Sequence, residues 1–306
     1  MSKMKLGSKS FKNNRELFFI SLPAIVAFFL VSYLPMFGLV IAFENFNYKK
    51  GVFGSTWVWF ENFKFFFTSQ DAFRVTRNTI LLNGAFIIIG LAVAIFLAIL
   101  LNEIPRRAVK AYQSVLFVPY FLSWVVVGYL TYGFLNRDLG VINSLLKVFH
   151  LQPVDWYGDP KYWPVILIIT YLWKNAGYLA IVFYTGILGI DTAYYEAASI
   201  DGASKFRQVW HITLPSIQPL IIMMLLLSIG KIFFSDFGLF YFIPRDIGTL
   251  YATTDVIDTY VYRSLRVIGD LGMASAAGFY QSIVGCVLVV GSNLILKKVS
   301  PENAIF

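Results

Sequence analysis

Six apolar segments, each long enough to cross a bilayer, constrain this chain more than any other feature of its sequence. A membrane-spanning helix needs about 20 predominantly apolar residues. The expected helices cover residues 17–43, 78–101, 114–135, 163–188, 216–235 and 274–296. Prolines inside several segments are compatible with this, because neighbouring groups in a membrane bundle satisfy the freed carbonyls. The sequence predicts an all-α membrane protein, with one transmembrane domain over residues 1–306.

The composition supports lipid-facing helices rather than a water-facing surface. The chain is 58% hydrophobic and 14% charged, whereas soluble domains carry about a quarter charged residues. The single cysteine, Cys286, excludes a disulfide framework and a thiolate metal cluster. The histidines, His150 and His211, lie in different loops. We therefore expect no metal site and no catalytic residues.

The charge distribution predicts the orientation in the membrane. Six helices put both termini on one side, and the segments on that side are denser in Lys and Arg than the longer loops opposite. Lys3, Lys5, Lys9 and Lys12 contribute most of this excess. By the positive-inside rule, both termini are cytoplasmic. The apolar run after these lysines continues to Phe43 without a cleavage site, which indicates an uncleaved first helix rather than a signal peptide. The net charge of +8 thus reports orientation, and no nucleic-acid partner is expected.

The loop over residues 191–215 has its own expected structure. Thr192 is placed to cap a short helix that runs through Ala198. Gly202 is free to take a positive φ and turn the chain sharply. A second short helix is expected over residues 203–211. The result is a helix–turn–helix at the cytoplasmic surface.

The same loop offers a docking surface. Ala197, Ala198 and Ala203 leave room for another protein to approach, and Glu196 is an exposed acid beside them. Pro215 is expected to end this unit and to start the fifth spanning helix. A rigid elbow between two spanning helices would transmit a push from a partner.

The loop also carries a recognisable pattern, Glu-Ala-Ala, three residues, Gly, nine residues and Ile-x-Leu-Pro. It resembles the signature loop of binding-protein-dependent ABC importer permeases, and Asp201-Gly202-Ala203 resembles the carbohydrate-uptake branch of that family. The residues assigned to ATPase coupling by this resemblance are Glu196, Ala197, Ala198, Asp201, Gly202, Ala203, Ile212, Leu214 and Pro215.

Further segments are similar to the polysaccharide-type permeases of Gram-positive bacteria. They are residues 33–43, 119–127 and 255–263, together with Asn293, Lys297 and Lys298 near the end of the chain. Glu44 departs from that group, in which a basic or neutral residue is expected. This departure concerns contacts at the outer surface and does not change the class.

The resemblance implies a type I importer permease that is not itself an enzyme. It implies a heterodimer with a second homologous permease, a dimer of ATPase subunits seated on the coupling loop, and an external sugar-binding lipoprotein that delivers an oligosaccharide. This chain would bind no cofactor; ATP and Mg would bind to the ATPase. Gly230-Lys231 lacks the earlier glycine and the hydroxyl residue of a phosphate-binding loop, which fits a separate ATPase.

Polar residues within or near the spanning segments are candidate sugar contacts, because such groups usually face a cavity or a partner. On the fourth expected helix, Lys174, Asn175 and Tyr178 share one face. The full set of candidates is Ser123, Trp124, Lys174, Asn175, Tyr178, Lys231, Ser235 and Asp236. Sugars need such a mixture of hydrogen-bonding groups and aromatic faces.

Structural interpretations compete with each of these assignments. Lys231 could snorkel to the interface, Lys174 could pair with Asp236, and Trp124 could serve packing alone. In some importers only one of the two permeases contacts the sugar. Two intramembrane lysines would also suit an acidic sugar.

Three alternative functions stay open on the sequence. An importer permease for an amino acid or phosphate would carry the same loop. An ion-gradient-driven secondary transporter would need inverted repeats and intramembrane acids, for which Asp236 is the only candidate. A membrane enzyme would need a paired catalytic constellation, which we do not find. In every case the chain contacts membrane lipid.

Overall fold

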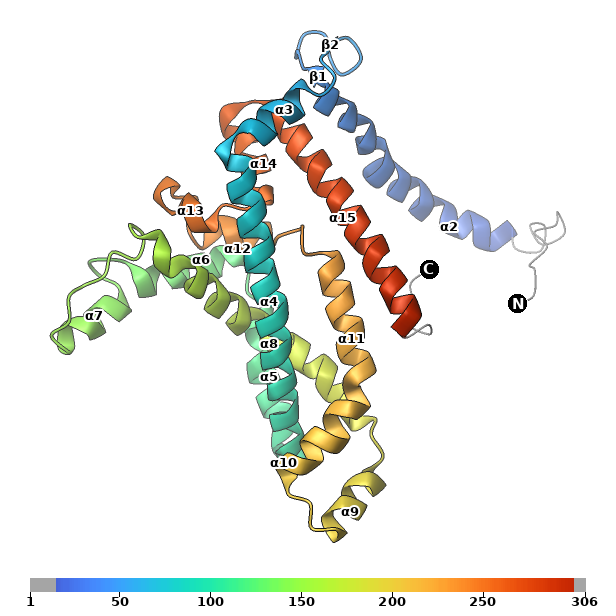
Figure 1. The fold of residues 1–306 in the computed structure, drawn as a ribbon, viewed down its shortest axis with the longest axis vertical. Helices are drawn as coiled ribbons and strands as arrows, with labels where there is room; N and C mark the ends of the chain where they lie inside the picture. The colour runs from blue at the N-terminus through green and yellow to red at the C-terminus, as the bar shows by residue number, and fades with distance from the viewer. Residues whose placement is uncertain (1–14, 300–306) are drawn as a thin grey trace.

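The computed structural model describes residues 15–299 and confirms the all-α membrane class (Figure 1). The basic residues Lys3, Lys5, Lys9 and Lys12 and the C-terminal residues 300–306 lie outside the described residues. The described elements are α2 (Arg15–Phe28), η1 (Phe29–Tyr33), η2 (Leu34–Phe43), β1 (Glu44–Asn45), β2 (Thr56–Trp57), α3 (Glu61–Thr68), α4 (Gln70–Glu103), α5 (Arg106–Phe121), α6 (Trp124–Leu135), α7 (Val141–Val148), η3 (Pro160–Tyr162), α8 (Trp163–Leu188), α9 (Thr192–Ile200), α10 (Lys205–Gln208), η4 (Val209–Thr213), α11 (Leu214–Gly230), α12 (Phe237–Phe242), η5 (Gly248–Leu250), α13 (Tyr251–Thr254), α14 (Ile257–Arg263), η6 (Ser264–Ile268) and α15 (Leu271–Val299).

Five of the expected spans are helices long and apolar enough to cross a membrane. They run over Phe18–Phe43, Gln70–Glu103, Pro160–Leu188, Lys205–Gly230 and Leu271–Lys298. The fourth expected span coincides with α8 at both ends, and α4 is longer than expected because it begins at Gln70 and ends at Glu103. The short strands β1 and β2 form an antiparallel pair directly after the C-terminal end of η2, with Glu44 opposite Trp57.

The third expected span is broken, and the prediction of one continuous helix over residues 114–135 is wrong. Helices α5 and α6 meet at an angle of 96°. Pro119 lies inside α5, where its missing amide hydrogen removes one helical hydrogen bond, and the helix ends two residues later, where Leu122 and Ser123 adopt extended backbone conformations. The Ser123 hydroxyl then caps α6 by accepting a hydrogen bond from the Val126 amide (3.3 Å). As a result α6 and α7 form an arm that leaves the bundle sideways (Figure 1).

The fifth expected span also differs at its C-terminal end. Helix α11 stops at Gly230, and residues 231–236 form a turn before α12 begins at Phe237. The candidates Lys231, Ser235 and Asp236 therefore lie outside the helix that the sequence placed them on.

The core is organised around α4 and α8, which pack along their length. Near the middle, the rings of Phe86 and Tyr171 stack with their centroids 4.3 Å apart. Helix α5 also packs on α8, at a point where a Cβ atom on Gly177 would lie 1.9 Å from the Leu116 carbonyl oxygen. Only glycine permits this close approach, which sets the position of α5 on α8.

The first span stands apart from this core. Helix α2 diverges from α15 on one side of the molecule (Figure 1), and the most apolar window of the span Phe18–Phe43 contains no buried residue. Its last part, η2, packs against α15. The rest of this helix exposes its side chains over its whole circumference.

Candidate functional site

The predicted coupling loop lies at the end of the molecule opposite the β1–β2 pair (Figure 1). It contains α9 and α10, as expected for a helix–turn–helix. The cap of α9 differs from the prediction: Asp191 accepts a hydrogen bond from the Ala193 amide (3.0 Å), and Thr192 is the first helical residue. An aspartate at this position also favours the positive end of the helix dipole.

Gly202 makes the turn that the sequence predicts. Its φ of +75° is in the left-handed region, where residues with a Cβ atom are disfavoured. The Gly202 amide donates to the Ser199 carbonyl (3.1 Å), and the Ala203 amide donates to the Ala198 carbonyl (2.8 Å). These paired bonds form a Schellman motif, which satisfies the last carbonyls of α9.

Side chains hold the two short helices in one arrangement. The Gln208 amide nitrogen donates to the Ser199 hydroxyl (3.0 Å) and to the Ala203 carbonyl (3.2 Å). The hydroxyls of Tyr195 and Thr213 lie 2.9 Å apart in a hydrogen bond. The loop is therefore a rigid elbow rather than a flexible connection.

The elbow is continuous with the fifth spanning helix. The chain is helical from Lys205 to Gly230, so Pro215 does not separate α10 from the span as expected. The π-helical turn η4 explains this, because the Leu214 amide donates to the Val209 carbonyl five residues earlier. This wider turn accommodates Pro215 at the start of α11. A salt bridge of 3.1 Å between Lys205 and Glu103 adds a link to the end of α4.

The coupling residues assigned from the sequence lie at or near the surface of the elbow. Glu196, Ala197, Asp201, Gly202 and Pro215 are exposed, and Ala198, Ala203, Ile212 and Leu214 are half-buried. The sequence reasoning missed large apolar side chains around them, which are Tyr194, Ile200, Phe206 and Trp210, all more than half exposed. The sequence does contain a signal that could have identified them, namely aromatic residues in a loop that is otherwise expected to face the cytoplasm. An exposed apolar patch of this kind marks an interaction surface.

The candidate sugar contacts gather at the break between α5 and α6. The Lys174 ammonium donates to the carbonyl of Tyr120 (2.6 Å) and lies 3.5 Å from that of Pro119. These carbonyls belong to the last turn of α5. The side chain of Lys174 is buried, and its nitrogen is 5.1 Å from the centre of the Trp124 ring. Lys174 therefore caps the broken helix.

The alternative interpretation, an ion pair between Lys174 and Asp236, is not among the salt bridges of residues 15–299. Asp236 instead accepts a hydrogen bond of 2.7 Å from the indole nitrogen of Trp124. Its other carboxylate oxygen caps α12 by accepting from the Gly238 amide (3.0 Å). The Trp124–Asp236 bond thus joins the start of α6 to the start of α12.

Stacked rings lie beside this junction. Tyr178, 40% exposed, stacks on Tyr120 with centroids 4.8 Å apart, and Tyr120 stacks on Phe117 at 5.6 Å. We call these three rings the aromatic shelf. Sequence reasoning found Tyr178 but missed the other two. Asn175 donates to the Tyr171 carbonyl within α8 (3.0 Å).

The other candidates have separate roles. Ser123 caps α6, and Lys231 is the C-terminal cap of α11 with an exposed side chain. Ser235 lies in the turn after α11, where its hydroxyl accepts from the Asn83 amide (2.9 Å). The structure thus unites Lys174, Trp124, Asp236 and Tyr178 around the α5–α6 break.

Three residues that the sequence analysis did not select fasten the turn after α11. Asp258 of α14 accepts from the Ser235 amide (2.9 Å) and from the Gln281 side chain of α15 (3.0 Å). Gln281 also donates to the Phe233 carbonyl (2.7 Å), and Asn83 of α4 donates to the Ile232 carbonyl (2.8 Å). Burial raises the pKa of the Asp258 carboxyl. The turn that carries Asp236 is consequently held from three helices.

Comparisons with known proteins agree with this arrangement. The family of binding-protein-dependent transport system inner membrane components matches residues 90–300. Protein LplB of Bacillus subtilis (strain 168) is 35% identical over 294 residues, with 95% of this chain and 92% of LplB covered. The polygalacturonan/rhamnogalacturonan transport system permease protein YteP of the same organism is 34% identical over 290 residues, with 94% and 90% covered.

A solved structure is similar over the whole described fold. It is the crystal structure of a bacterial ABC transporter involved in the import of the acidic polysaccharide alginate, with a TM-score of 0.87 and 32% sequence identity. The match covers 95% of this chain and 98% of that chain. A second structure of the alginate transporter, in complex with an alginate pentasaccharide-bound periplasmic protein, matches with a TM-score of 0.86 and 32% identity over 95% of this chain and 97% of that chain.

The fold and these comparisons define a multi-pass membrane component of an importer. The chain belongs to the family of binding-protein-dependent transport system inner membrane components. It is the permease part of an ABC transporter and not an enzyme.

Proposed function

We propose that this chain forms, with a second homologous permease, the translocation pathway for an oligosaccharide delivered by an external sugar-binding lipoprotein. A separate dimer of ATPase subunits would bind and hydrolyse ATP with Mg, and one subunit would seat the α9–α10 elbow. The N- and C-termini would lie in the cytoplasm of a bacterial cell, as the distribution of Lys and Arg suggests.

The rigid elbow is the observation that carries this proposal. Its internal hydrogen bonds fix α9 against α10, and the helix continues without a break from Lys205 into α11. A displacement of the elbow would therefore move the span directly. The exposed Tyr194, Ile200, Phe206 and Trp210 supply apolar contact area for the ATPase.

The unburied first span supports a second permease. Helix α2 and η1, which form the first part of the span Phe18–Phe43, are exposed around their circumference and have no packing partner within the described chain on most of their faces. Membrane helices gain stability by packing on other helices. A homologous subunit would cover part of this span, and lipid the rest.

The aromatic shelf supports a carbohydrate cargo. Tyr178 and Tyr120 present stacked ring faces next to Trp124, and the Asp236 carboxylate adds an exposed acceptor. Aromatic faces combined with hydrogen-bonding groups suit a sugar ring. The polysaccharides in the names of YteP and of the alginate transporter support the same class of cargo.

Uptake by the reconstituted importer tests the proposal. Proteoliposomes that contain this chain, the second permease and the ATPase should accumulate an oligosaccharide only under two conditions. ATP must be enclosed on the side of the membrane where the ATPase subunits lie, and the binding protein must be present on the opposite side. Collapse of ion gradients by ionophores should leave the initial rate unchanged. Uptake that continues without ATP while an ion gradient is maintained would contradict the proposal and favour a secondary transporter. Uptake of an amino acid or phosphate in place of every sugar would contradict the carbohydrate cargo.

A further inference from the structure

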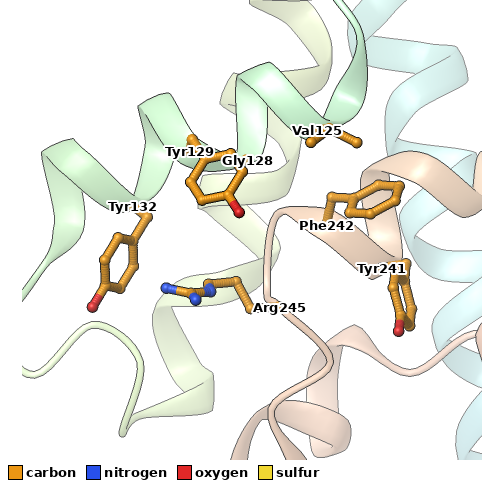
Figure 2. Close-up of a pocket in the computed structure, with 7 residues that line it drawn as sticks. All are labelled: Val125, Gly128, Tyr129, Tyr132, Tyr241, Phe242 and Arg245. Carbon is orange, nitrogen blue, oxygen red and sulfur yellow. The ribbon is translucent and has the colours of Figure 1, made fainter.

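A cavity of about 170 Å³ lies between α6 and α12, outward from the Trp124–Asp236 junction (Figure 2). Tyr129 and Tyr132 of α6 line it from one side, and Tyr241 and Arg245 from the other. Gly128 closes its floor: a Cβ atom there would lie 2.8 Å from the Phe242 carbonyl oxygen, so the two helices touch. The cavity therefore shares both of its walls with the candidate sugar site.

Arg245 is a cation without an acidic partner in this cavity. Its guanidinium carbon lies 4.2 Å from the centre of the Tyr132 ring, and Figure 2 shows the guanidinium pointing across toward that ring. Among residues 15–299, none of the salt bridges includes Arg245. Two acids of the same outer region, Asp246 and Asp155, instead pair with Arg263 (3.1 Å) and Arg137 (3.3 Å).

The backbone that carries Arg245 is strained and firmly anchored. Arg245 and Asp246 have φ values of +59° and +49°, a conformation that residues with side chains adopt only when their surroundings enforce it. The Asp246 carboxylate supplies the anchor by accepting from the Tyr251 hydroxyl (3.0 Å) and from Arg263 (3.1 Å). Arg263 is fixed in turn by the buried Asp255 (2.7 Å). The backbone at Arg245 is thus fixed, and the exposed side chain is held by its contact with the Tyr132 ring.

The remaining walls suit a sugar. Tyr129 is 70% exposed. The ring of Tyr241 stacks on that of Phe237, with the centroids 5.0 Å apart. Aromatic side chains combine an apolar ring face with a polar hydroxyl tip. The cavity accordingly offers ring faces and phenol hydroxyls around one guanidinium.

We propose that this cavity is a subsite for the carboxylate of an acidic sugar residue, such as a uronate within an oligosaccharide. Arg245 would bind the carboxylate through two parallel hydrogen bonds, the geometry in which arginine recognises such groups. The tyrosines would contact the sugar ring, and the next sugar residue would lie toward Trp124. This inference rests on the proposed function, because it assigns the charge of the cargo on the same pathway.

The test uses proteoliposomes with the whole importer and its binding protein. The cargoes are an oligogalacturonate and its carboxyl-reduced counterpart, which has the same linkages without the charges. We expect Arg245→Gln to lower uptake of the acidic cargo about tenfold, the loss expected for one charged hydrogen-bonded pair. Arg245→Lys should give an intermediate rate, because it retains the charge but not the planar pair of donors. The matched control Arg137→Gln, which removes an exposed arginine of the same outer region, should leave uptake unchanged.

Several outcomes would overturn the inference while leaving the proposed function in place. Uptake of the carboxyl-reduced cargo in preference to the acidic one would do so, as would an unchanged rate for Arg245→Gln. Loss of the second permease from the purified Arg245→Gln complex would identify a subunit interface instead. A defect seen with phosphatidylglycerol vesicles but not with pure phosphatidylcholine would identify a lipid headgroup as the anion. Absence of uptake for both cargoes and for neutral sugars would contradict the proposed function itself.

Discussion

Replacement of Gly202 by proline is expected to abolish ATP-driven uptake while the chain still inserts into the membrane and assembles. Proline fixes φ near −65° and has no amide hydrogen, whereas Gly202 needs a φ of +75° and donates to the Ser199 carbonyl. The Schellman motif would be lost, and α9 would no longer be fixed against α10. Uptake and the amount of assembled complex in the membrane are the two measurements.

The control for this prediction is Gly202→Asn. A Cβ atom at this position would meet nothing within 4 Å, and asparagine tolerates the left-handed conformation. Uptake by Gly202→Asn should therefore stay close to that of the wild type.

Glu196→Lys should also abolish uptake, because it reverses an exposed charge on α9 without changing the turn. Normal transport by Gly202→Pro and Glu196→Lys would show that the elbow is not the coupling element.

Replacement of Asp255 by alanine should destabilise the region where α14 packs on α4 by about 3–5 kcal/mol, the usual effect of removing one partner from a buried ion pair. The Asp255 side chain is fully buried, and it accepts from Arg74 (3.0 Å), Arg263 (2.7 Å) and Thr259 (3.0 Å). Without it, Arg74 and Arg263 would keep only their more exposed partners, Asp71 (2.7 Å) and Asp246 (3.1 Å). Thermal unfolding of the purified complex in detergent measures the loss.

Asp71→Ala is the matched control for this second prediction. Asp71 also pairs with Arg74, at 2.7 Å, but its side chain is 42% exposed. Exposed ion pairs contribute about 0–1 kcal/mol, so the midpoint of unfolding should change little. Equal shifts for Asp71→Ala and Asp255→Ala would contradict the assignment of Asp255 as the centre of the network.

The sequence was sufficient for features that depend on local pattern. Hydropathy identified α4, α8 and α15, because a membrane helix satisfies its own backbone and needs only length and apolar side chains. The turn at Gly202 was likewise predictable, since it follows from the conformational freedom of one residue. The cap of α9 was misplaced by a single residue, at Thr192 instead of Asp191.

The breaks in the helices were not predictable, because distant residues stabilise them. Pro119 alone is compatible with a continuous membrane helix, but the buried Lys174 satisfies the freed end of α5 from α8. The end of α11 depends in the same way on Asp258 and Gln281 from later helices. Conversely, Pro215 is tolerated within a helix because η4 widens by one residue.

The candidate sugar site was likewise only partly predictable from the sequence. Polarity within apolar segments pointed to Lys174 and Tyr178, and the structure brings both to the α5–α6 break. The cavity at Arg245 had no sequence signal, because its walls come from α6 and α12, which are about 100 residues apart in the chain. The close approach at Gly128 and the Trp124–Asp236 hydrogen bond bring them together.

Cysteine cross-linking tests most directly whether the elbow meets the ATPase. On a Cys286→Ser background, a cysteine replaces Ile200 on α9 or, as the control, Leu139 in the arm formed by α6 and α7; both native side chains are 87% exposed. With a short bifunctional reagent, Ile200→Cys should cross-link to the ATPase subunit, and Leu139→Cys should not. Cross-linking of the ATPase to Leu139→Cys, with none to Ile200→Cys, would contradict both the coupling assignment and the orientation of the chain.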